Sequence, residues 1–317
     1  MIKVFKKPGK SGNTIVSVLI SSKYYNFWKK YVYKNWKIYC DKFDIGLIVI
    51  DNFVDTSKSK KKITWHKLLI GKEILNSNIS KKISNVCYLD ADILMNSYGA
   101  PDIFKEHSVK KISVVNQFNN LPYDLFTTQK KISFFRHTFY SKKYPLDSSI
   151  FMKPTQIFKF HGFRQFNNYF CAGLFIFNLK LFSKFLENIY FKYSKNFKSL
   201  TGGDEPIVNY EFQKYGKLNW IDYKFQAIWP YEMANKYPFL YYKKYRKKTL
   251  QSECVTASLT SNYFLHFAGS WGESEMIKSL KNYTTNNSKT IIKNFYKYNS
   301  VLPKAKPKGL IKPNLNN

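Results

Sequence analysis

Apolar and polar residues alternate in blocks over the first fifty residues of the chain. Residues 15–20 form a β-branched run typical of a buried strand, and Ser21 directly behind it can cap a helix. Aromatic and aliphatic side chains then recur at helical spacing over residues 24–36, and a second apolar run covers residues 45–50. This order of strand, helix and strand predicts a βαβ unit.

The alternation continues beyond this unit. A helical pattern over residues 65–75 precedes an apolar run at residues 86–89, which ends at Asp90. Further strand-like runs cover residues 112–115 and 174–177, with helical patterns at residues 181–189 and from Pro206 onward. Residues 116–161 hold scattered prolines without a sustained period, which predicts loops and short helices.

Such an order predicts an α/β fold in which a mixed, mainly parallel central sheet is flanked by helices. Ligands of open α/β sheets bind at the carboxyl ends of the strands, so the chemistry is expected there. We expect a basic arm at residues 1–13, one domain over residues 14–302, and a disordered tail rich in Lys and Pro at residues 303–317.

The composition indicates the charge of the partner. The 52 Lys and Arg residues outnumber the 20 Asp and Glu residues, and the resulting formal net charge of +32 attracts phosphates of any kind. Arginine occurs only at Arg136, Arg164 and Arg246, whereas proteins that read nucleic-acid sequence rely on bidentate arginine contacts. We therefore expect an anionic partner but no specific nucleic acid.

The cysteines and the hydropathy exclude several classes of protein. The four cysteines lie far apart, without the paired spacing of a zinc knuckle or a redox motif. No apolar run reaches the roughly 18 residues of a membrane span, and the first eight residues lack the apolar stretch of a signal peptide. The expectation is a cytoplasmic protein without a transmembrane segment.

Two carboxylates, Asp90 and Asp92, stand where the apolar run 86–89 ends. Alternate residues of an extended segment point the same way, so both side chains can face one divalent cation. Mg²⁺ and Mn²⁺ are commonly held by carboxylates together with substrate phosphates. The alternative is a turn in which both acids accept hydrogen bonds from backbone N–H groups.

Three further motifs follow this pair in order. They are Asn168-Tyr-Phe-Cys-Ala-Gly-Leu-Phe-Ile-Phe-Asn178, Gly202-Gly-Asp-Glu-Pro-Ile-Val-Asn209 and Leu265-His-Phe-Ala-Gly269. With the segment around Asp90 and Asp92, they make residues 15–269 similar to glycogenin-type family 8 glycosyltransferases, which have the Rossmann-like GT-A fold. The resemblance implies retaining transfer of a hexose of the glucose or galactose type from a UDP-sugar, with Mn²⁺ or Mg²⁺ held by Asp90, Asp92 and His266.

The resemblance also implies which residues contact the donor. They are Ile20, Ser21, Tyr24, Lys67, Asp90, Ala91, Asp92, Cys171, Ala172, Gly173, Asp204, His266 and Gly269. The chain departs from the family at two of these places. Cys171 stands where relatives have a polar Asn, and the sequence after Gly269 lacks the lysine that meets the diphosphate in the family. Lys67 is then expected to supply positive charge, unless it is an ordinary solvated lysine, and the alternative for His266 is a packed core histidine.

Asp204 and Glu205 open the helical pattern at Pro206. In the family, an Asp-Gln pair at this place reaches the donor sugar, so the resemblance implies catalytic roles for both acids. A carboxylate at Glu205 can stabilise an oxocarbenium-like transition state or act as a nucleophile in a double displacement. Alternatively, both acids cap the helix and complement its dipole.

The leading hypothesis is a metal-dependent retaining glycosyltransferase that uses a UDP-sugar donor and a glycan or protein hydroxyl as acceptor. The competing hypothesis is a catalytically weak or inactive GT-A-like module that binds a nucleotide-sugar or a glycan, because the missing lysine and Cys171 affect donor contacts. A third hypothesis is a basic nucleic-acid-binding protein, whose affinity would depend steeply on salt.

Overall fold

The computed structural model describes residues 1–58, 60–140, 152–194, 196–197, 203–269 and 272–282. Within them, a seven-stranded sheet has the order β1-β3-β2-β4-β7-β6-β8. Its strands are β1 (Ile2–Lys6), β2 (Asn13–Val18), β3 (Gly46–Ile50), β4 (Asn85–Leu89), β6 (Ile112–Asn116), β7 (Phe170–Asn178) and β8 (Leu218–Ile221). β1 and β7 run antiparallel to the other strands. The predicted α/β class with a mixed, mainly parallel sheet is confirmed.

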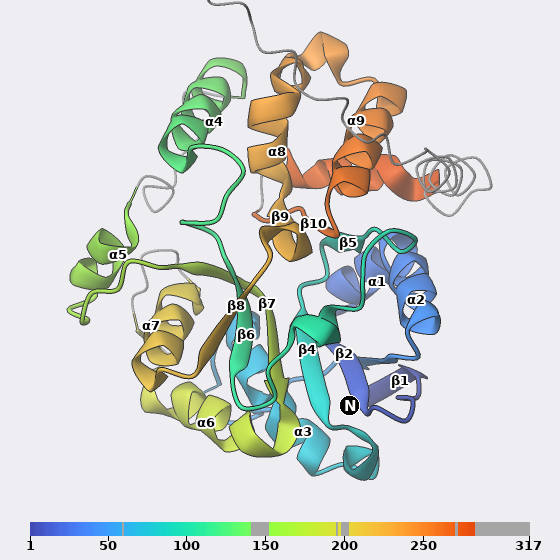
Figure 1. Cartoon of the computed structure of the whole chain (residues 1–317), viewed down its shortest axis with the longest axis vertical. Helices are drawn as coiled ribbons and strands as arrows, with labels where there is room; N and C mark the ends of the chain where they lie inside the picture. Colours follow the sequence, from blue (N-terminus) through green and yellow to red (C-terminus); the bar gives the residue numbers. More distant parts are fainter. Residues whose placement is uncertain (59, 141–151, 195, 198–202, 270–271, 283–317) are drawn as a thin grey trace, which may run out of the picture.

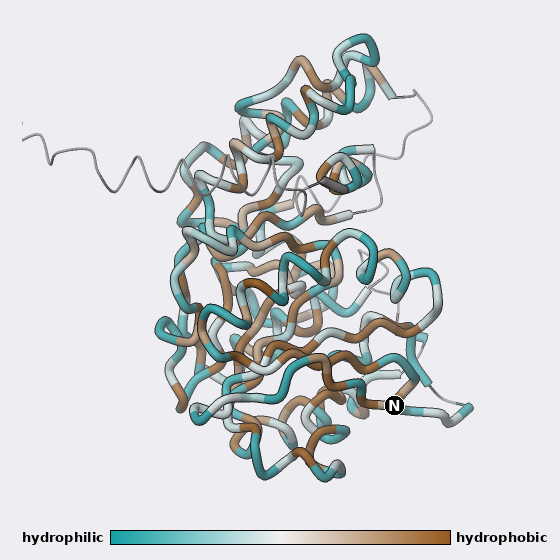
Figure 2. Tube along the Cα trace, turned by 90° about the vertical axis from the view of Figure 1, so that its right-hand side faces the viewer, coloured by the Kyte–Doolittle hydropathy of each residue, from teal (hydrophilic) through white to brown (hydrophobic). Residues whose placement is uncertain are grey.

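Helices cover both faces of this sheet (Figure 1). One face is covered by α1 (Ser22–Tyr31) and α2 (Tyr33–Lys42), and the other by α3 (Ile70–Leu75), α6 (Leu179–Lys192) and α7 (Glu205–Tyr215). Ile15 joins the first core and Val16 the second, because successive side chains of a strand point to opposite faces. Figure 2 shows the resulting hydrophobic segments running through the body of the molecule.

A second, smaller sheet follows the carboxyl end of β4. It has the order β5-β10-β9, with β5 at Ile93–Met95, β9 at Ala227–Ile228 and β10 at Phe264–His266. Above it in Figure 1 stand α4 (Leu125–Phe139), α8 (Trp229–Lys236) and α9 (Lys248–Ser261), while α5 (Pro154–Phe160) lies to one side. Short 3₁₀ helices complete the described chain: η1 (Ile63–Leu69), η2 (Ser80–Lys82), η3 (Ile103–Glu106), η5 (Tyr223–Gln226), η6 (Pro238–Tyr241), η7 (Lys243–Tyr245) and η8 (Ser274–Asn282).

Two elements differ from the sequence analysis. The expected basic arm contains β1, which pairs antiparallel with β3 with Ile2 opposite Ile50, and its lysines concealed the strand pattern. The region expected to hold only short helices contains α4, a helix of 15 residues that Asp124 caps by accepting a hydrogen bond from Thr127 N at 2.7 Å. Its buried face carries Gln129 and Arg136, so no apolar period marked the helix. The expected tail at residues 303–317 lies outside the described residues.

The helical pattern of residues 24–36 is interrupted at Val32, which separates α1 from α2. The pattern of residues 65–75 begins as the 3₁₀ helix η1 and continues as α3. The positions of the predicted strands in the central sheet agree with the structure to within a few residues.

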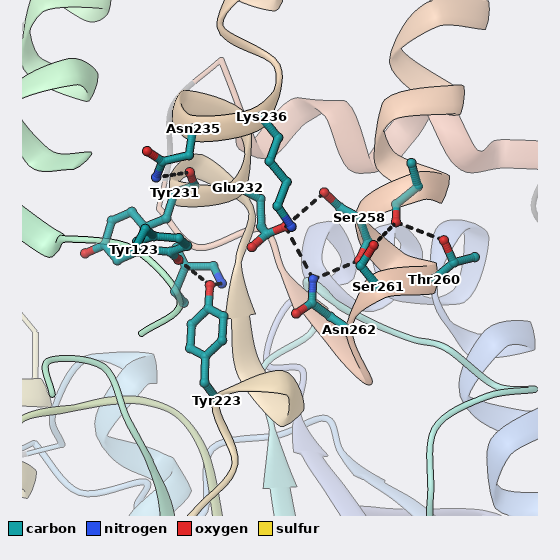
Figure 3. A network of polar contacts seen from close by, with 12 residues as sticks. Tyr123, Tyr223, Tyr231, Glu232, Asn235, Lys236, Ser258, Thr260, Ser261 and Asn262 are labelled. Carbon is teal, nitrogen blue, oxygen red and sulfur yellow. Dashed lines mark hydrogen bonds and ion pairs between the residues drawn. The ribbon is translucent and has the colours of Figure 1, made fainter. Parts of the chain in front are cut away.

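A buried carboxylate joins the helices above the small sheet (Figure 3). Glu232 on α8 is fully buried, and one of its oxygens, Oε2, lies 2.5 Å from Lys236 Nζ one helical turn away. The same oxygen accepts hydrogen bonds from Ser258 Oγ at 3.2 Å and Asn262 Nδ2 at 3.4 Å, so Glu232 ties α8 to α9 and to the residue that follows it.

None of the helices in the described part of the chain is long and apolar enough to cross a lipid bilayer.

Candidate functional site

Three potential metal ligands meet at the carboxyl end of β4. Asp90, Asp92 and His266 each offer one ligand atom, and these atoms lie within 4.8 Å of one another. His266 Nε2 is 3.3 Å from Asp92 Oδ1 and 3.9 Å from Asp90 Oδ2. The imidazole is buried, whereas the carboxylates of Asp90 and Asp92 keep 37% and 30% of their surface exposed. The structure thus brings together the three residues that the resemblance implies as ligands.

The small sheet explains how His266 reaches two acids that lie far from it in the sequence. β5 begins directly after Asp92, and its antiparallel pairing with β10 places His266 opposite Ile93. The backbone N–H of Phe267 donates to Asp92 O at 3.0 Å, and that of Asp90 donates to Gly173 O at 2.9 Å. Backbone hydrogen bonds therefore hold all three side chains in place.

Gly173 on β7 makes room for this cluster. A Cβ added at this residue would lie 2.6 Å from Asp90 Oδ2 and 2.6 Å from His266 Cε1, closer than non-bonded heavy atoms approach. On the other side, the hydroxyl of Tyr88 donates a hydrogen bond to Asp90 Oδ1. Burial raises the pKa of the Tyr88 phenol well above its usual value, so the phenol stays a neutral donor. Gly173 and Tyr88 together fix the position of Asp90.

The second ring nitrogen of His266 faces the interior. His266 Nδ1 lies 3.2 Å from the side-chain nitrogen of Gln226 and 3.7 Å from Cys171 Sγ. Gln226 is fully buried, and its Oε1 has no hydrogen-bond partner among the described residues. If the terminal amide is turned over, Oε1 accepts a hydrogen bond from Nδ1–H, and the Nε2 lone pair faces Asp92.

Without a cation, the environment favours a protonated His266. Burial alone would lower the pKa of the imidazole, but the neighbouring Cys171 and Asp92 raise it, and the net pKa lies well above the usual value. A divalent cation bound to Nε2 would displace that proton.

Lys67 is a residue of η1, and its side chain is buried next to Asp204. Its Nζ is 2.9 Å from Asp204 Oδ2 and donates a hydrogen bond to Ala172 O at 2.9 Å. Only 6% of the Lys67 side chain and 4% of the Asp204 side chain are exposed, so the alternative of a solvated lysine is wrong. Burial opposes the charge of the ammonium, but the carboxylates of Asp204 and Asp90 raise the pKa of Lys67 above its usual value. The lysine is therefore a fixed positive charge.

Asp204 and Glu205 do not serve α7 as ordinary caps. Asp204 occupies the N-cap position, but its side chain makes no capping hydrogen bond and faces Lys67 instead. Glu205 Oε2 accepts a hydrogen bond from Ala172 N, on β7, at 3.2 Å. Burial raises the pKa of the Glu205 carboxyl above its usual value. Both acids thus face β7 and the cluster rather than their own helix.

Glu205, Cys171 and Gly269 line a cavity of about 290 Å³, which we call the α4 cavity. One face of α4 closes it with side chains spaced by three or four residues: Leu125, Gln129, Ile132 and Arg136. Gly269 has a φ of +91°, a conformation that side-chain-bearing residues rarely adopt. The predicted donor residues Cys171 and Gly269 therefore share a cavity with the predicted catalytic Glu205.

A second cavity of about 760 Å³ lies at the carboxyl ends of β2 and β3, and we call it the β2–β3 cavity. Ile20 and Ser21 line it, as do Tyr25 and Asp51. Tyr24 is 49% exposed and is not part of this lining, although the resemblance implied a donor contact there. Its neighbour Tyr25 occupies the cavity wall instead.

The order of these features follows the order of the strands. The β2–β3 cavity lies at the ends of β2 and β3, the Asp90–Asp92–His266 cluster at the end of the adjacent β4, and the α4 cavity beside β7, the next strand. Ala91 stands between the two aspartates, and Ala172 supplies backbone contacts to Lys67 and Glu205. The cluster is thus flanked by a cavity on each side.

The charges of the site fit a divalent cation. Asp90, Asp92, Asp204 and Glu205 are four of the 20 acidic residues of a chain with a net charge of +32. Lys67 pairs directly with Asp204, whereas the ion-pairing partner of Asp90 and Asp92 among the described residues is the imidazole of His266. Two carboxylates and one imidazole form a donor set suited to a divalent metal such as Mn²⁺.

Sequence reasoning missed two residues that shape the site. Gln226 lies at the end of a 3₁₀ helix with no pattern to mark it, and only the pairing of β9 with β10 brings it to His266. Gln117 lines the α4 cavity with an Oε1 that has no hydrogen-bond partner among the described residues. It directly follows β6, so its place at the carboxyl end of a strand was a usable signal.

No profile of a known protein family and no curated protein matches the chain. Solved structures similar to it include a glycosyltransferase involved in glycosylation of the major capsid of PBCV-1, at 10% identity and a TM-score of 0.46, covering 84% of this chain and 96% of that one. The galactosyltransferase LgtC, in complex with donor and acceptor sugar analogs, is 14% identical at a TM-score of 0.43. The match covers 85% of this chain and 95% of LgtC.

The bifunctional glycosyltransferase WbbM is 12% identical at a TM-score of 0.43. The match covers 91% of this chain but only 51% of WbbM, so this chain spans about half of that protein. All three are glycosyltransferases, the class that the sequence motifs resemble. Because the identities are at most 14% and the TM-scores lie below 0.5, the function of this chain has to follow from its own site.

Proposed function

We propose that the chain is a metal-dependent retaining glycosyltransferase of the GT-A type, which transfers a hexose from a UDP-sugar to a hydroxyl acceptor. The observation that carries this proposal is the position of the Asp90–Asp92–His266 cluster between two cavities at the carboxyl end of the sheet. In this proposal the nucleoside occupies the β2–β3 cavity and the hexose occupies the α4 cavity, so the diphosphate that joins them would cross the cluster.

Asp90, Asp92 and His266 would hold the cation, with Mn²⁺ favoured over Mg²⁺ by the imidazole in the donor set. The metal would neutralise the diphosphate and so improve it as a leaving group. The segment Gly269-Ser-Trp-Gly-Glu-Ser lacks the lysine that the family has at this place, and the ammonium of Lys67 is paired with Asp204. We therefore assign the neutralisation of the diphosphate chiefly to the metal.

The acids beyond the metal have separate roles in this proposal. Lys67 holds Asp204 in place, and Asp204 binds a hydroxyl of the donor sugar. Glu205 lines the α4 cavity, where its carboxylate stabilises the positive charge that develops at the anomeric carbon. A nucleophilic Glu205 would instead form a bond to that carbon as the bond from the carbon to the UDP diphosphate breaks, and the acceptor hydroxyl would then displace Glu205 from the sugar. Full activity of the Glu205→Gln variant would exclude the nucleophilic role, because an amide keeps the shape but cannot act as a carboxylate nucleophile.

The proposal is tested by a panel of nucleotide-sugars, assayed for nucleotide release with Mn²⁺ and with EDTA. We expect one UDP-hexose to be turned over with Mn²⁺ and not with EDTA. Binding of UDP-sugar without turnover under any condition would favour the non-catalytic module, which the exchange at Cys171 makes the second candidate. If no nucleotide-sugar of the panel is bound or turned over, both the glycosyltransferase and the non-catalytic module are contradicted.

A further inference from the structure

The segment that follows η6 carries lysines and exposed aromatic rings together. Residues 242–248 read Tyr-Lys-Lys-Tyr-Arg-Lys-Lys, and no Asp or Glu occurs from residue 233 to residue 252. The four lysines of this segment are exposed, and Tyr242 and Tyr245 expose 44% and 42% of their surface. Arg246 instead points inward, where Nε donates to Leu240 O at 2.9 Å.

This segment continues onto the outer face of α4. The ring of Tyr242 lies 4.2 Å from that of Phe139, and the guanidinium of Arg246 lies 4.6 Å from the ring of Tyr140. The outer face of α4 carries Lys130, Lys131 and Phe134, with Phe134 63% exposed, and the helix contains no acidic residue. We call residues 242–248 and this face of α4 the basic aromatic surface.

We propose that the basic aromatic surface binds anionic lipid membranes. Four adjacent exposed lysines are attracted to anionic headgroups, and exposed Tyr and Phe rings enter the interfacial region of a bilayer. The rings of Phe134, Tyr242 and Tyr245 are exposed, on α4 and at η7, whereas proteins that bind single-stranded nucleic acids stack bases along a positively charged groove. Phe134 has no polar atom to offer to water, which also favours a lipid surface.

Membrane binding would also orient the proposed active site. Gln129, Ile132 and Arg136, on the inner face of α4, line the α4 cavity, while Lys130 and Phe134 lie on its outer face. The membrane-binding proposal does not depend on catalysis, since it requires only the described surface. Its failure would leave the proposed function untouched.

The test is co-sedimentation of the full chain with phosphatidylcholine vesicles, with and without phosphatidylserine. We expect binding only to the anionic vesicles, and binding that weakens with salt. Reversing the charge of Lys243, Lys244 and Lys247 to Glu should weaken it by at least about 100-fold, since each lysine near the surface contributes about five-fold. Nucleotide release from soluble donor should be unchanged.

A matched control replaces Lys81, Lys82 and Lys180 by Glu. These lysines are exposed at the end of β4 and β7 that lies away from the Asp90–Asp92–His266 cluster. This control has the same change in net charge and should keep at least most of the vesicle binding. Phe134→Gln should weaken vesicle binding, whereas Leu181→Gln, at an exposed apolar residue of α6, should not. Three results would each overturn the proposal. They are equal losses of vesicle binding in the two triple variants, no vesicle binding by the wild type, and preference of the wild type for single-stranded RNA over anionic vesicles.

Discussion

Two groups of carboxylates in this molecule are surrounded in opposite ways. Glu232 is fully buried, and one of its oxygens is met by an ammonium, a hydroxyl and an amide that come from α8, from α9 and from the residue after it (Figure 3). Asp90 and Asp92 are about one third exposed, and they face each other and His266. The first acid joins helices, and the other two present oxygens to a shared point.

The difference separates an acid that holds helices together from acids whose geometry could hold a cation. A buried carboxylate is tolerated when donors from the protein meet it, as three donors meet Oε2 of Glu232, while Oε1 has no hydrogen-bond partner among the described residues. Asp90 receives a hydrogen bond from Tyr88, and one carboxylate oxygen of Asp90 lies within 4.8 Å of one of Asp92, so the two like charges repel each other. A divalent cation removes that repulsion, so the variants below should separate metal binding from stability.

The largest effect is expected for Asp92→Asn. The amide keeps the volume of the side chain but removes one charged ligand, so metal-dependent turnover should fall by at least about 100-fold. The melting temperature should stay close to that of the wild type, because Asp92 is partly exposed. Nucleotide release under saturating Mn²⁺ measures the effect, and turnover at the wild-type rate would show that Asp92 is not a ligand.

Gly173→Ala should weaken Mn²⁺ binding by about 100-fold, because the new methyl group displaces Asp90 and His266 from each other. Gly71→Ala is the matched control, since its Cβ would collide with Ser183 on α6, away from the site. The control should lose stability and keep its Mn²⁺ affinity. Equal Mn²⁺ affinity in Gly173→Ala and the wild type would mean that the cluster is not the binding site.

A smaller effect is expected for Gln226→Leu, which removes the amide beside His266 Nδ1. Without an acceptor at Nδ1, the ring can carry its proton on Nε2, and Mn²⁺ affinity should fall by about 10-fold. Gln226→Glu keeps an acceptor and should retain more of the affinity than Gln226→Leu. The reverse order of these two variants would argue against a role of Gln226 in setting the tautomer.

The smallest effect on the site is expected for Glu232→Gln. Loss of the charge opposite Lys236, whose side chain is 41% exposed, should cost about 1 kcal/mol of unfolding free energy, and the melting temperature should fall by about 2–4 °C. Mn²⁺ affinity should not change. Thermal denaturation and Mn²⁺ titration of the same sample check both statements. A loss of Mn²⁺ affinity at unchanged stability would contradict the assignment of a structural role to Glu232.

Much of the central sheet could be predicted because its strands are continuous apolar runs, as at residues 45–50 and 86–89. The position of Asp90 and Asp92 followed from the end of such a run. The partners of these acids could not be predicted in the same way. His266 reaches them through β5 and β10, which have three residues each and carry too little pattern to recognise.

The pairing of Lys67 with Asp204 also lay beyond pattern reasoning. The two residues are far apart in the sequence, and a buried lysine looks the same as a solvated one in so lysine-rich a chain. The resemblance to a known family selected both residues, but only the structure shows that they contact each other. β1 and α4 were missed for a related reason, since polar side chains on their packed faces concealed the period.

Titration of Mn²⁺ into the full chain by calorimetry, at about pH 6 and about pH 8, tests the proposed metal centre most directly. We predict one ion per chain and release of a proton, because His266 has a raised pKa and must lose its proton to bind a metal. Affinity should therefore fall as the pH falls, by at least about 10-fold over this range, and His266→Ala should bind weakly with little dependence on pH. Absence of Mn²⁺ binding at both pH values, or equal affinity in the wild type and Asp92→Asn, would contradict the assignment of Asp90, Asp92 and His266 as a metal centre.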